Sequence, residues 1–186
     1  MNTYQRAYIA LITGASAGIG LELTRKLLSE EWQVVALNRS EFPADDVSIQ
    51  KAINSRRLRI YKVTDLEDYA SLRQALEEIK NNEQRIDILF NNAGRSFHEL
   101  SYSIQGREKH YELMTVVPYI ILMELKAHLI GGRLKTVINT SSSALKFTKE
   151  FSIELLEHPT TFRKLIGPYA TSKLALSLWT QAIAPQ

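Results

Sequence analysis

Short, continuous apolar runs alternate along the chain with longer segments whose apolar residues recur at helical spacing. Continuous apolar runs are typical of strands that are buried on both faces of a sheet. The pattern predicts five strands, at residues 8–12, 34–37, 58–63, 86–90 and 136–139. It predicts helices that begin near residues 19, 69, 107 and 169. This alternation indicates the doubly wound α/β class, a parallel sheet with helices on both faces.

Length and composition narrow the class of protein further. The 186 residues show no repeat, low-complexity tract or linker, so we expect a single domain over residues 1–186. The chain is 45% hydrophobic and 23% charged, as is usual for a soluble globular protein. Its net charge of +3 comes without a basic run, so we expect no nucleic-acid partner.

Cysteine, histidine and apolar content exclude several kinds of site. The sequence has no cysteine, which excludes disulfides and thiolate metal sites and fits a reducing compartment. Its four histidines are scattered, so we expect no metal. No secretory signal is visible at the start, and no apolar stretch is long enough to span a bilayer. We therefore expect a cytoplasmic protein without a membrane partner.

A glycine-rich turn follows the first predicted strand and opens the first predicted helix. Gly14, Gly18 and Gly20 allow the backbone to approach a pyrophosphate, and the helix N-terminus presents free N–H groups to it. The spacing differs from G-x-G-x-x-G because the three-residue gap comes first. The turn predicts a bound dinucleotide, and the alternative is a plain strand-to-helix turn.

The residues after the second predicted strand indicate which dinucleotide is bound. Proteins that prefer NAD usually carry an acidic residue here, whereas this chain has Asn38 followed by Arg39. Because an arginine can make bidentate contacts to a 2′-phosphate, we expect NADP(H) to be preferred over NAD(H). The alternative is that Arg39 is merely solvated.

Tyr169 and Lys173 lie four positions apart in the last predicted helix, which places both side chains on one helix face. A nearby ammonium favours the ionised form of a phenol, as a proton-transfer group requires near neutral pH. Most such pairs are solvated helix faces. Here, however, the glycine turn, Asn91–Gly94 and Ser141–Ser143 are all expected at the same rim of the sheet.

Taken together, these motifs resemble those of the short-chain dehydrogenase/reductase family, in its carbonyl-reductase-like branch. The resemblance implies a Rossmann-like fold and spans the chain from its first strand to its last helix. The matching residues are Thr13–Gly20, Asp65-Leu66, Asn91-Asn92-Ala93-Gly94, Ser142 and Tyr169-x-x-x-Lys173.

The resemblance implies hydride transfer between NADP(H) and a small carbonyl or alcohol substrate. Ser142 is similar to the donor to the substrate carbonyl, with Ser141 and Ser143 as alternatives. Tyr169 is similar to the general acid in reduction and the base in oxidation. Lys173 is similar to the residue that binds the nicotinamide ribose and acts on the tyrosine.

The resemblance also implies how the cofactor is bound. Asp65 is similar to the residue that meets the adenine, and Asn91 to the one that ties the central strands together. The expected cofactor-binding residues are Gly14, Ser16, Gly18, Ile19, Gly20, Asn38, Arg39, Asp65, Leu66, Asn91, Ala93, Gly94, Tyr169 and Lys173.

The chain departs from the family pattern in three places. Met114 stands where the family usually has an asparagine that helps to hold a proton-relay water. Residues 145–168 resemble an inserted helical element, which either shapes the substrate pocket or is a surface insertion. The last strands of the family are missing after Gln186, so we expect a C-terminal truncation or a part not contained in this sequence.

Two rival functions remain at this stage. A dinucleotide-binding sensor that has lost catalysis is favoured by Met114 and disfavoured by the Tyr169/Lys173 pair. A sugar-nucleotide epimerase fits less well because its glycine turn is usually spaced differently. We also expect a homodimer or homotetramer. Its face would be formed by Ile120, Ile121, Leu125, Leu174, Leu178 and Trp179, unless these residues cover the sheet instead.

Overall fold

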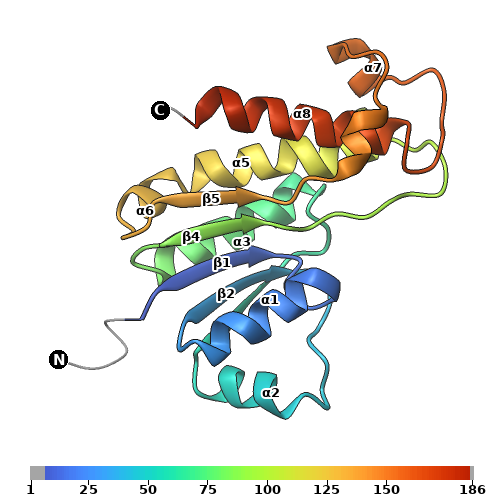
Figure 1. Ribbon diagram of the computed structural model, residues 1–186. Coiled ribbons are helices and arrows are strands. Elements are labelled where there is room, and N and C mark those ends of the chain that lie inside the picture. The colour runs from blue at the N-terminus through green and yellow to red at the C-terminus, as the bar shows by residue number, and fades with distance from the viewer. Residues whose placement is uncertain (1–6, 185–186) are drawn as a thin grey trace. The chain divides into compact units, whose positions relative to one another are not determined.

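The computed structural model describes residues 7–184 and places five strands in one sheet (Figure 1). The strand order is β3-β2-β1-β4-β5, with β1 at Ile9–Thr13, β2 at Gln33–Asn38, β3 at Leu58–Lys62, β4 at Ile88–Asn91 and β5 at Thr136–Asn139. β1 pairs in parallel with β2 and β4, and β2 pairs in parallel with β3. The predicted α/β class is confirmed. Residues 1–6, on which the argument about a secretory signal rests, and residues 185–186 lie outside the described part.

Three helices follow the first three strands along the chain, and aspartate side chains cap two of them. α1 spans Gly18–Ser29, α2 Val47–Asn54 and α3 Tyr69–Asn82. Asp46 caps α2 by accepting from Ser48 N–H and Ile49 N–H, and Asp68 caps α3 in the same way. α1 lies in front of the sheet in Figure 1, and α3 lies behind it. Because both faces are covered, all five residues of β1 are buried.

The chain divides into two compact units. Unit 1 comprises Met1–Ala93 and Leu122–Ile138, and unit 2 comprises Gly94–Ile121 and Asn139–Gln186. Unit 1 contains β1 to β4 and most of β5, with α1, α2 and α3. Unit 2 contains the segments that carry Ser142, Tyr169 and Lys173. The expectation of a single domain over residues 1–186 stays a prediction.

A buried carboxylate organises the edge of unit 1 where β1 and β4 begin. Asp87 is fully buried and accepts from the backbone N–H groups of Ile9 and Arg133, each at 2.7 Å. The guanidinium of Arg85 also donates to it, at 3.3 Å. A buried carboxylate is tolerated here because several donors satisfy it.

The region expected to be helical over about residues 107–129 is helical from Lys109 to Ile130 apart from Leu125, but it is divided into shorter pieces. These are α4 at Lys109–Tyr111, the π-helical turn η2 at Glu112–Val116, α5 at Val117–Glu124 and α6 at Lys126–Ile130. α5 continues directly from η2, so Pro118 lies inside a helical run, and the missing N–H of the proline falls beside the π turn. Apolar spacing alone did not reveal these changes, because buried apolar residues recur at helical spacing through the break at Leu125, as at Ile121 and Leu129.

The segment expected to be an inserted helical element does contain short helices. They are the 3₁₀ turn η3 at Ser143–Phe147 and α7 at Ile153–Glu157. Phe147, Phe151 and Ile153 are exposed there. α8 follows at Pro168–Ile183, with its proline in the first turn.

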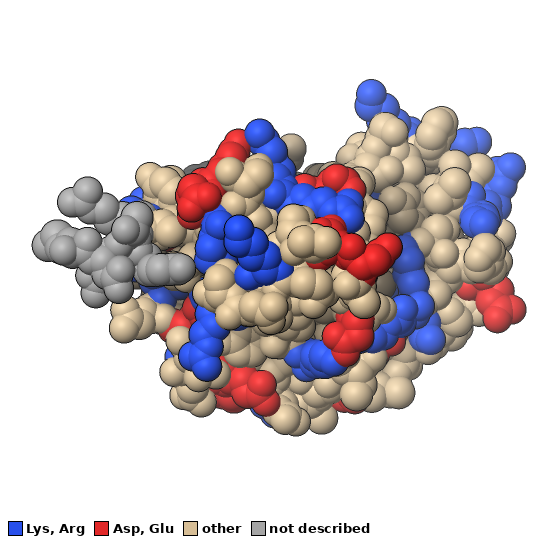
Figure 2. All heavy atoms as spheres, turned by 90° about the horizontal axis from the view of Figure 1, so that it is seen from below, with Lys and Arg blue, Asp and Glu red and all other residues tan. Residues whose placement is uncertain are grey.

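The described residues contain no helix of the length and apolar character required to cross a bilayer. Acidic and basic side chains are interspersed on the face seen in Figure 2. Within the described ranges, no three metal-ligating side chains form a group that could hold an ion.

Candidate active site

The glycine-rich turn of unit 1 leaves no room for a side chain at Gly20 and little at Gly14. Gly14 has φ +67°, and a Cβ there would lie 3.1 Å from the Cα of Ala93. A Cβ at Gly20 would lie 2.1 Å from the carbonyl oxygen of Gly14. Gly18 has φ +53° but open space around it. Glycine is thus required by packing at position 20 and by backbone conformation at position 18.

The same turn is tied to the end of β4. The hydroxyl of Thr13 accepts from the backbone N–H groups of Asn92 and Ala93, both at 3.0 Å. The amide of Asn92 donates to the carbonyl of Thr13 at 3.1 Å. Asn91 lies buried at the last position of β4. Sequence reasoning named Asn91 as the tie between strands and missed Thr13 and Asn92, whose bonds follow from the parallel pairing of β1 with β4.

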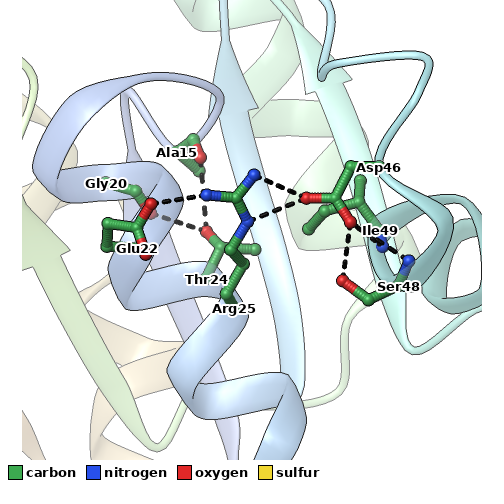
Figure 3. A network of polar contacts seen from close by, with 8 residues as sticks. All are labelled: Ala15, Gly20, Glu22, Thr24, Arg25, Asp46, Ser48 and Ile49. Carbon is green, nitrogen blue, oxygen red and sulfur yellow. Dashed lines mark hydrogen bonds and ion pairs between the residues drawn. The ribbon is translucent and has the colours of Figure 1, made fainter.

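The N-terminus of α1 is open to an anion. Its N-cap residue, Ala17, supplies no side-chain hydrogen bond, so the first N–H groups of the helix keep their donor capacity. Ile19 is 72% exposed at this end. Ser16 is half-buried within the turn. Below the turn, Thr24 donates its hydroxyl to the carbonyl of Gly20 at 2.8 Å (Figure 3).

Asn38 has one amide hydrogen-bonding group in use and one unused. It is 1% exposed at the end of β2, and its Oδ1 accepts from Ala15 N–H at 2.7 Å. Its Nδ2 has no hydrogen-bond partner in the part of the chain that the structure describes. A buried amide donor without a partner costs free energy unless a ligand supplies an acceptor. Asn38 therefore has an unused donor beside the glycine turn.

The remaining residues expected on the adenosine side also lie in unit 1. Arg39 is exposed directly after β2, and over residues 7–184 it forms no ion pair or hydrogen bond. Asp65 accepts from Glu67 N–H at 3.2 Å, which stabilises the turn before α3. Leu66 is buried beside it. Of these side chains, Arg39 keeps all of its hydrogen-bonding capacity for a ligand.

In unit 2, Tyr169 and Lys173 lie one turn apart at the start of α8. Tyr169 is half-buried, whereas Lys173 is 4% exposed. The ammonium of Lys173 donates to the carbonyl of Thr140 at 2.6 Å. Burial lowers the pKa of Lys173 to about 8. A lysine held in this way is charged at neutral pH and close to its titration point.

Three serines follow β5, and they have different partners. Ser141 shares a hydrogen bond of 2.8 Å with Ser177 of α8. Ser142 caps η3, since its Oγ accepts from Ala144 N–H at 3.2 Å. That bond leaves the hydroxyl proton of Ser142 available for donation. Ser143 is exposed.

Met114 is buried in η2, where its thioether meets Gly94. The Sδ atom lies 3.0 Å from the position that a Cβ on Gly94 would take, and Lys173 Nζ lies 3.8 Å from that position. Thr115, beside it, donates its hydroxyl to the carbonyl of Ser172 in α8 at 2.8 Å. The position at which the family usually places an amide therefore holds a buried, nonpolar side chain near the lysine.

The structure thus gathers the expected residues into two sets. One set, in unit 1, surrounds the glycine turn: Gly14, Ser16, Gly18, Ile19, Gly20, Asn38, Asn91 and Ala93. The other set, in unit 2, comprises Gly94, Ser142, Tyr169 and Lys173. Sequence reasoning missed Thr140, which acts through its backbone and has no side-chain signal. It also missed His110, which it counted among scattered histidines.

Comparison with known proteins identifies the family of this chain. A family model described as short chain dehydrogenase matches residues 8–153. A fatty acyl-CoA reductase of Acinetobacter baylyi is 26% identical over 182 residues, which cover 96% of this chain and 57% of the relative. Retinol dehydrogenase 12 of Bos taurus is 30% identical over 183 residues, covering 95% and 55% respectively. The chain therefore spans little more than half the length of these relatives.

Solved structures agree with the fold. A carbonyl reductase from chicken fatty liver, solved with NADPH bound, superposes with a TM-score of 0.67 at 23% identity. The match covers 95% of this chain and 70% of that one. Because the family model spans more than half of the sequence, the chain belongs to the short-chain dehydrogenase family.

Proposed function

We propose that the protein is an NADP(H)-dependent oxidoreductase that interconverts a carbonyl compound and its alcohol. One observation carries this proposal: a buried lysine, Lys173, lies one helical turn from the phenol of Tyr169 and is held by the carbonyl of Thr140. Burying an ammonium costs free energy, so a lysine that is buried in this way is a candidate for a functional residue. Membership of the dehydrogenase family supports the same reaction class.

The residues of unit 1 fit a dinucleotide. The glycine turn excludes side chains at Gly20, so the backbone can approach a phosphate there. The uncapped N-terminus of α1 offers N–H donors to the pyrophosphate, and Asn38 Nδ2 offers a buried donor to a sugar or phosphate oxygen. A bound nicotinamide supplies the hydride for the carbonyl carbon.

Arg39 supports NADP(H) over NAD(H). It follows β2, is exposed, and forms no ion pair among the residues described, so its guanidinium is available for a 2′-phosphate. Replacing Arg39 with Ala should weaken NADPH binding about tenfold to 100-fold, because a charged hydrogen-bonding group is lost. NADH binding should not change, and fluorescence titration with both nucleotides measures the difference. Equal weakening of both would contradict this assignment.

The side chains of Ser142, Tyr169 and Lys173 carry out the remaining steps of the reaction. In reduction, Ser142 donates a hydrogen bond to the substrate oxygen, where negative charge develops. Tyr169 donates its proton to that oxygen, and Lys173 keeps positive charge near the phenolate that remains. Oxidation runs the same steps backwards, with Tyr169 as the base.

Replacing Tyr169 with Phe tests the proposed chemistry. This change removes the proton donor but keeps the ring, so kcat for NADPH-dependent carbonyl reduction should fall by at least about 100-fold. The Kd for NADPH should stay near that of the wild type. The assay follows NADPH oxidation with a panel of aldehydes, ketones and diketones. Turnover retained by the variant would show that Tyr169 is not the acid.

A dinucleotide sensor without catalysis is the second candidate, and Met114 favours it. Its buried thioether occupies the position of the relay asparagine and cannot hold a water by hydrogen bonds of ordinary strength. Tight NADPH binding without turnover across the panel would favour the sensor.

We further propose a cytoplasmic homodimer or homotetramer that takes a small-molecule substrate. Ile121 and Leu125, two residues expected on the oligomer face, are buried in the single chain. Leu178 remains 43% exposed on α8, and the exposed Tyr119 lies edge-on to the half-buried ring of Trp179. Leu178 and Trp179, with the half-buried Ile120 and Leu174, are the expected residues that remain candidates for a contact between copies, and Tyr119 adjoins them. Light scattering of the purified protein gives the oligomeric state.

A further inference from the structure

His110 lies beside Tyr169 in unit 2 and has no part in the reaction proposed above. Its side chain is buried at the start of α4. The ring centroids of His110 and Tyr169 are 5.9 Å apart, with the planes at 87°, an edge-to-face arrangement. Tyr169 itself is only half-buried in the first turn of α8. Its ring therefore depends on side contacts of this kind to hold one orientation.

Hydrogen bonds fix the plane of the His110 ring from both sides. The backbone N–H of Phe97 donates to Nε2 at 3.0 Å, so Nε2 is the unprotonated nitrogen. The proton must then be on Nδ1, which donates to Glu108 Oε1 at 2.7 Å. The N–H donor of Phe97 therefore holds the imidazole ring as one neutral tautomer.

Glu108 is itself held in place. It is fully buried, and its second oxygen accepts from Tyr111 N–H at 3.0 Å. Its backbone N–H donates to the carbonyl of Glu157 at 3.0 Å. Since both carboxylate oxygens are occupied, the group cannot rotate without losing a bond. A buried carboxylate that is fully hydrogen-bonded is a rigid support for the imidazole.

Aromatic rings complete the surroundings of the imidazole. The Phe97 ring lies edge-on to it at 4.8 Å, with the planes at 89°, and the Phe162 ring is 6.2 Å away. These contacts leave the imidazole no second orientation that keeps both hydrogen bonds. A residue with this degree of constraint is typical of the shell that positions a reacting group.

We infer that His110 is a positioning residue for Tyr169, and that Glu108 holds the His110 ring in the orientation that sets the phenol for proton transfer. This inference rests on the proposed function, because it assigns the reacting proton to Tyr169. His110 acts through the tyrosine ring and does not touch the substrate. Small displacements of a reacting group lower the rate strongly without a matching loss of binding.

Kinetics of four variants test the inference. H110F keeps an aromatic ring but loses both hydrogen bonds, and E108L removes the acceptor for Nδ1–H. E108Q keeps one oxygen that can accept from Nδ1–H but loses the acceptor for Tyr111 N–H, and it serves as the partial rescue. The control is H158F, which removes an exposed imidazole that lies 6.1 Å from the Tyr102 ring.

We expect H110F and E108L to lower kcat by about tenfold to 100-fold while the Kd for NADPH stays unchanged. E108Q, which keeps only one of the two acceptor oxygens, should give a rate between those of E108L and the wild type, and H158F should match the wild type. A role in folding alone would instead lower thermal stability and leave kcat per folded molecule unchanged. That result, in a wild-type protein that reduces carbonyl compounds, would overturn the inference and leave the proposed function intact.

A second measurement does not depend on turnover. With 3-fluorotyrosine placed at position 169, the fluorine NMR spectrum reports the surroundings of the ring directly. We expect one narrow resonance in the wild type and in H158F, and a shifted or broadened one in H110F and E108L. An unchanged resonance in the latter two would overturn the positioning role. Absence of turnover in the wild type would overturn the proposed function, whereas the fluorine spectrum would still decide whether His110 orients the ring.

Discussion

At the scale of single residues, the most unusual group is the ammonium of Lys173. It is 4% exposed and its pKa is lowered by burial from 10.5 to about 8. Below about pH 8 both the folded and the unfolded chain hold the proton, so the folded state bears the full cost of burying the charge. Between about pH 8 and 10.5 only the unfolded chain keeps the proton. The free energy of unfolding therefore gains from this group as the pH rises through that window.

Replacing Lys173 with Met should reveal this cost in the protein without cofactor. At neutral pH the variant should be the more stable protein by up to about 3 kcal/mol, reduced by about 1 kcal/mol for the lost bond to the Thr140 carbonyl. The difference should shrink as the pH approaches 10.5. Urea unfolding of both proteins at about pH 7 and about pH 9.5 measures it. A difference independent of pH would mean that the ammonium is not desolvated.

Some residues of the site could be predicted from sequence and others could not. The glycines, Tyr169 and Lys173 were proposed from sequence because the chemistry expected of them depends on residue type and local spacing. Thr140 was not found because it contributes a backbone carbonyl, which every residue has. His110 was not found because its role depends on Phe97, Glu108 and Tyr169 meeting in space, although Glu108-x-His110 lies in the sequence as a possible pair.

At the scale of elements, α2 shows what apolar periodicity can miss. This eight-residue helix was not predicted, because only Ile49 and Ala52 are buried along it. Its start signal was nevertheless present in Asp46, a strong N-cap residue. The five strands were recovered because each contains adjacent apolar residues, and β5 was predicted at its observed bounds. The region expected to be helical over about residues 107–129 is helical over most of its length, but the π turn η2 and the break at Leu125 were not predicted.

The contribution of the α2 N-cap to thermal stability can be tested by two substitutions of Asp46. The hydroxyl of Ser48, the N–H of Ile49 and the guanidinium of Arg25 lower the pKa of Asp46 to about 2 (Figure 3). D46N keeps a capping oxygen and loses the ion pair with Arg25, which is 2.7 Å long. D46A loses both. Melting temperatures should therefore fall in the order wild type, D46N, D46A.

The dependence of thermal stability on acidic pH is the control for the ion pair between Asp46 and Arg25. The lowered pKa of Asp46 stabilises the folded state fully at pH values above the pKa of the unfolded chain, which is near 4. This contribution is lost as the pH falls through the pKa of the folded state, about 2. Melting curves of the wild type should lose this contribution over that range. D46N should not lose it, because its amide does not titrate. Equal acid sensitivity of the two proteins would assign the effect to other carboxylates.

At the scale of the whole molecule, the protection of backbone amides from hydrogen exchange should differ along the chain. β1 and β2 lie in the middle of the sheet, and the residues of β1 and all but the first of β2 are buried. η3 and α7 are short, and among their ten residues only Leu156 is buried. Hydrogen exchange should therefore be slowest in β1 and β2 and fastest in residues 143–157. Mass spectrometry of peptides after timed labelling measures both. Comparable protection of the two regions would contradict this expectation.

The position of β1 in the sheet also has a consequence for biosynthesis. β1 is made first but lies between β2 and β4, and the bond from Ile9 to Asp87 joins residues 78 positions apart. At ordinary translation speeds this interval lasts roughly 4 to 16 s. During that time a strand whose residues are all buried in the finished fold has at most one strand partner. The nascent chain is then most exposed to mispairing, and a ribosome-associated chaperone would have its greatest effect on yield in this interval.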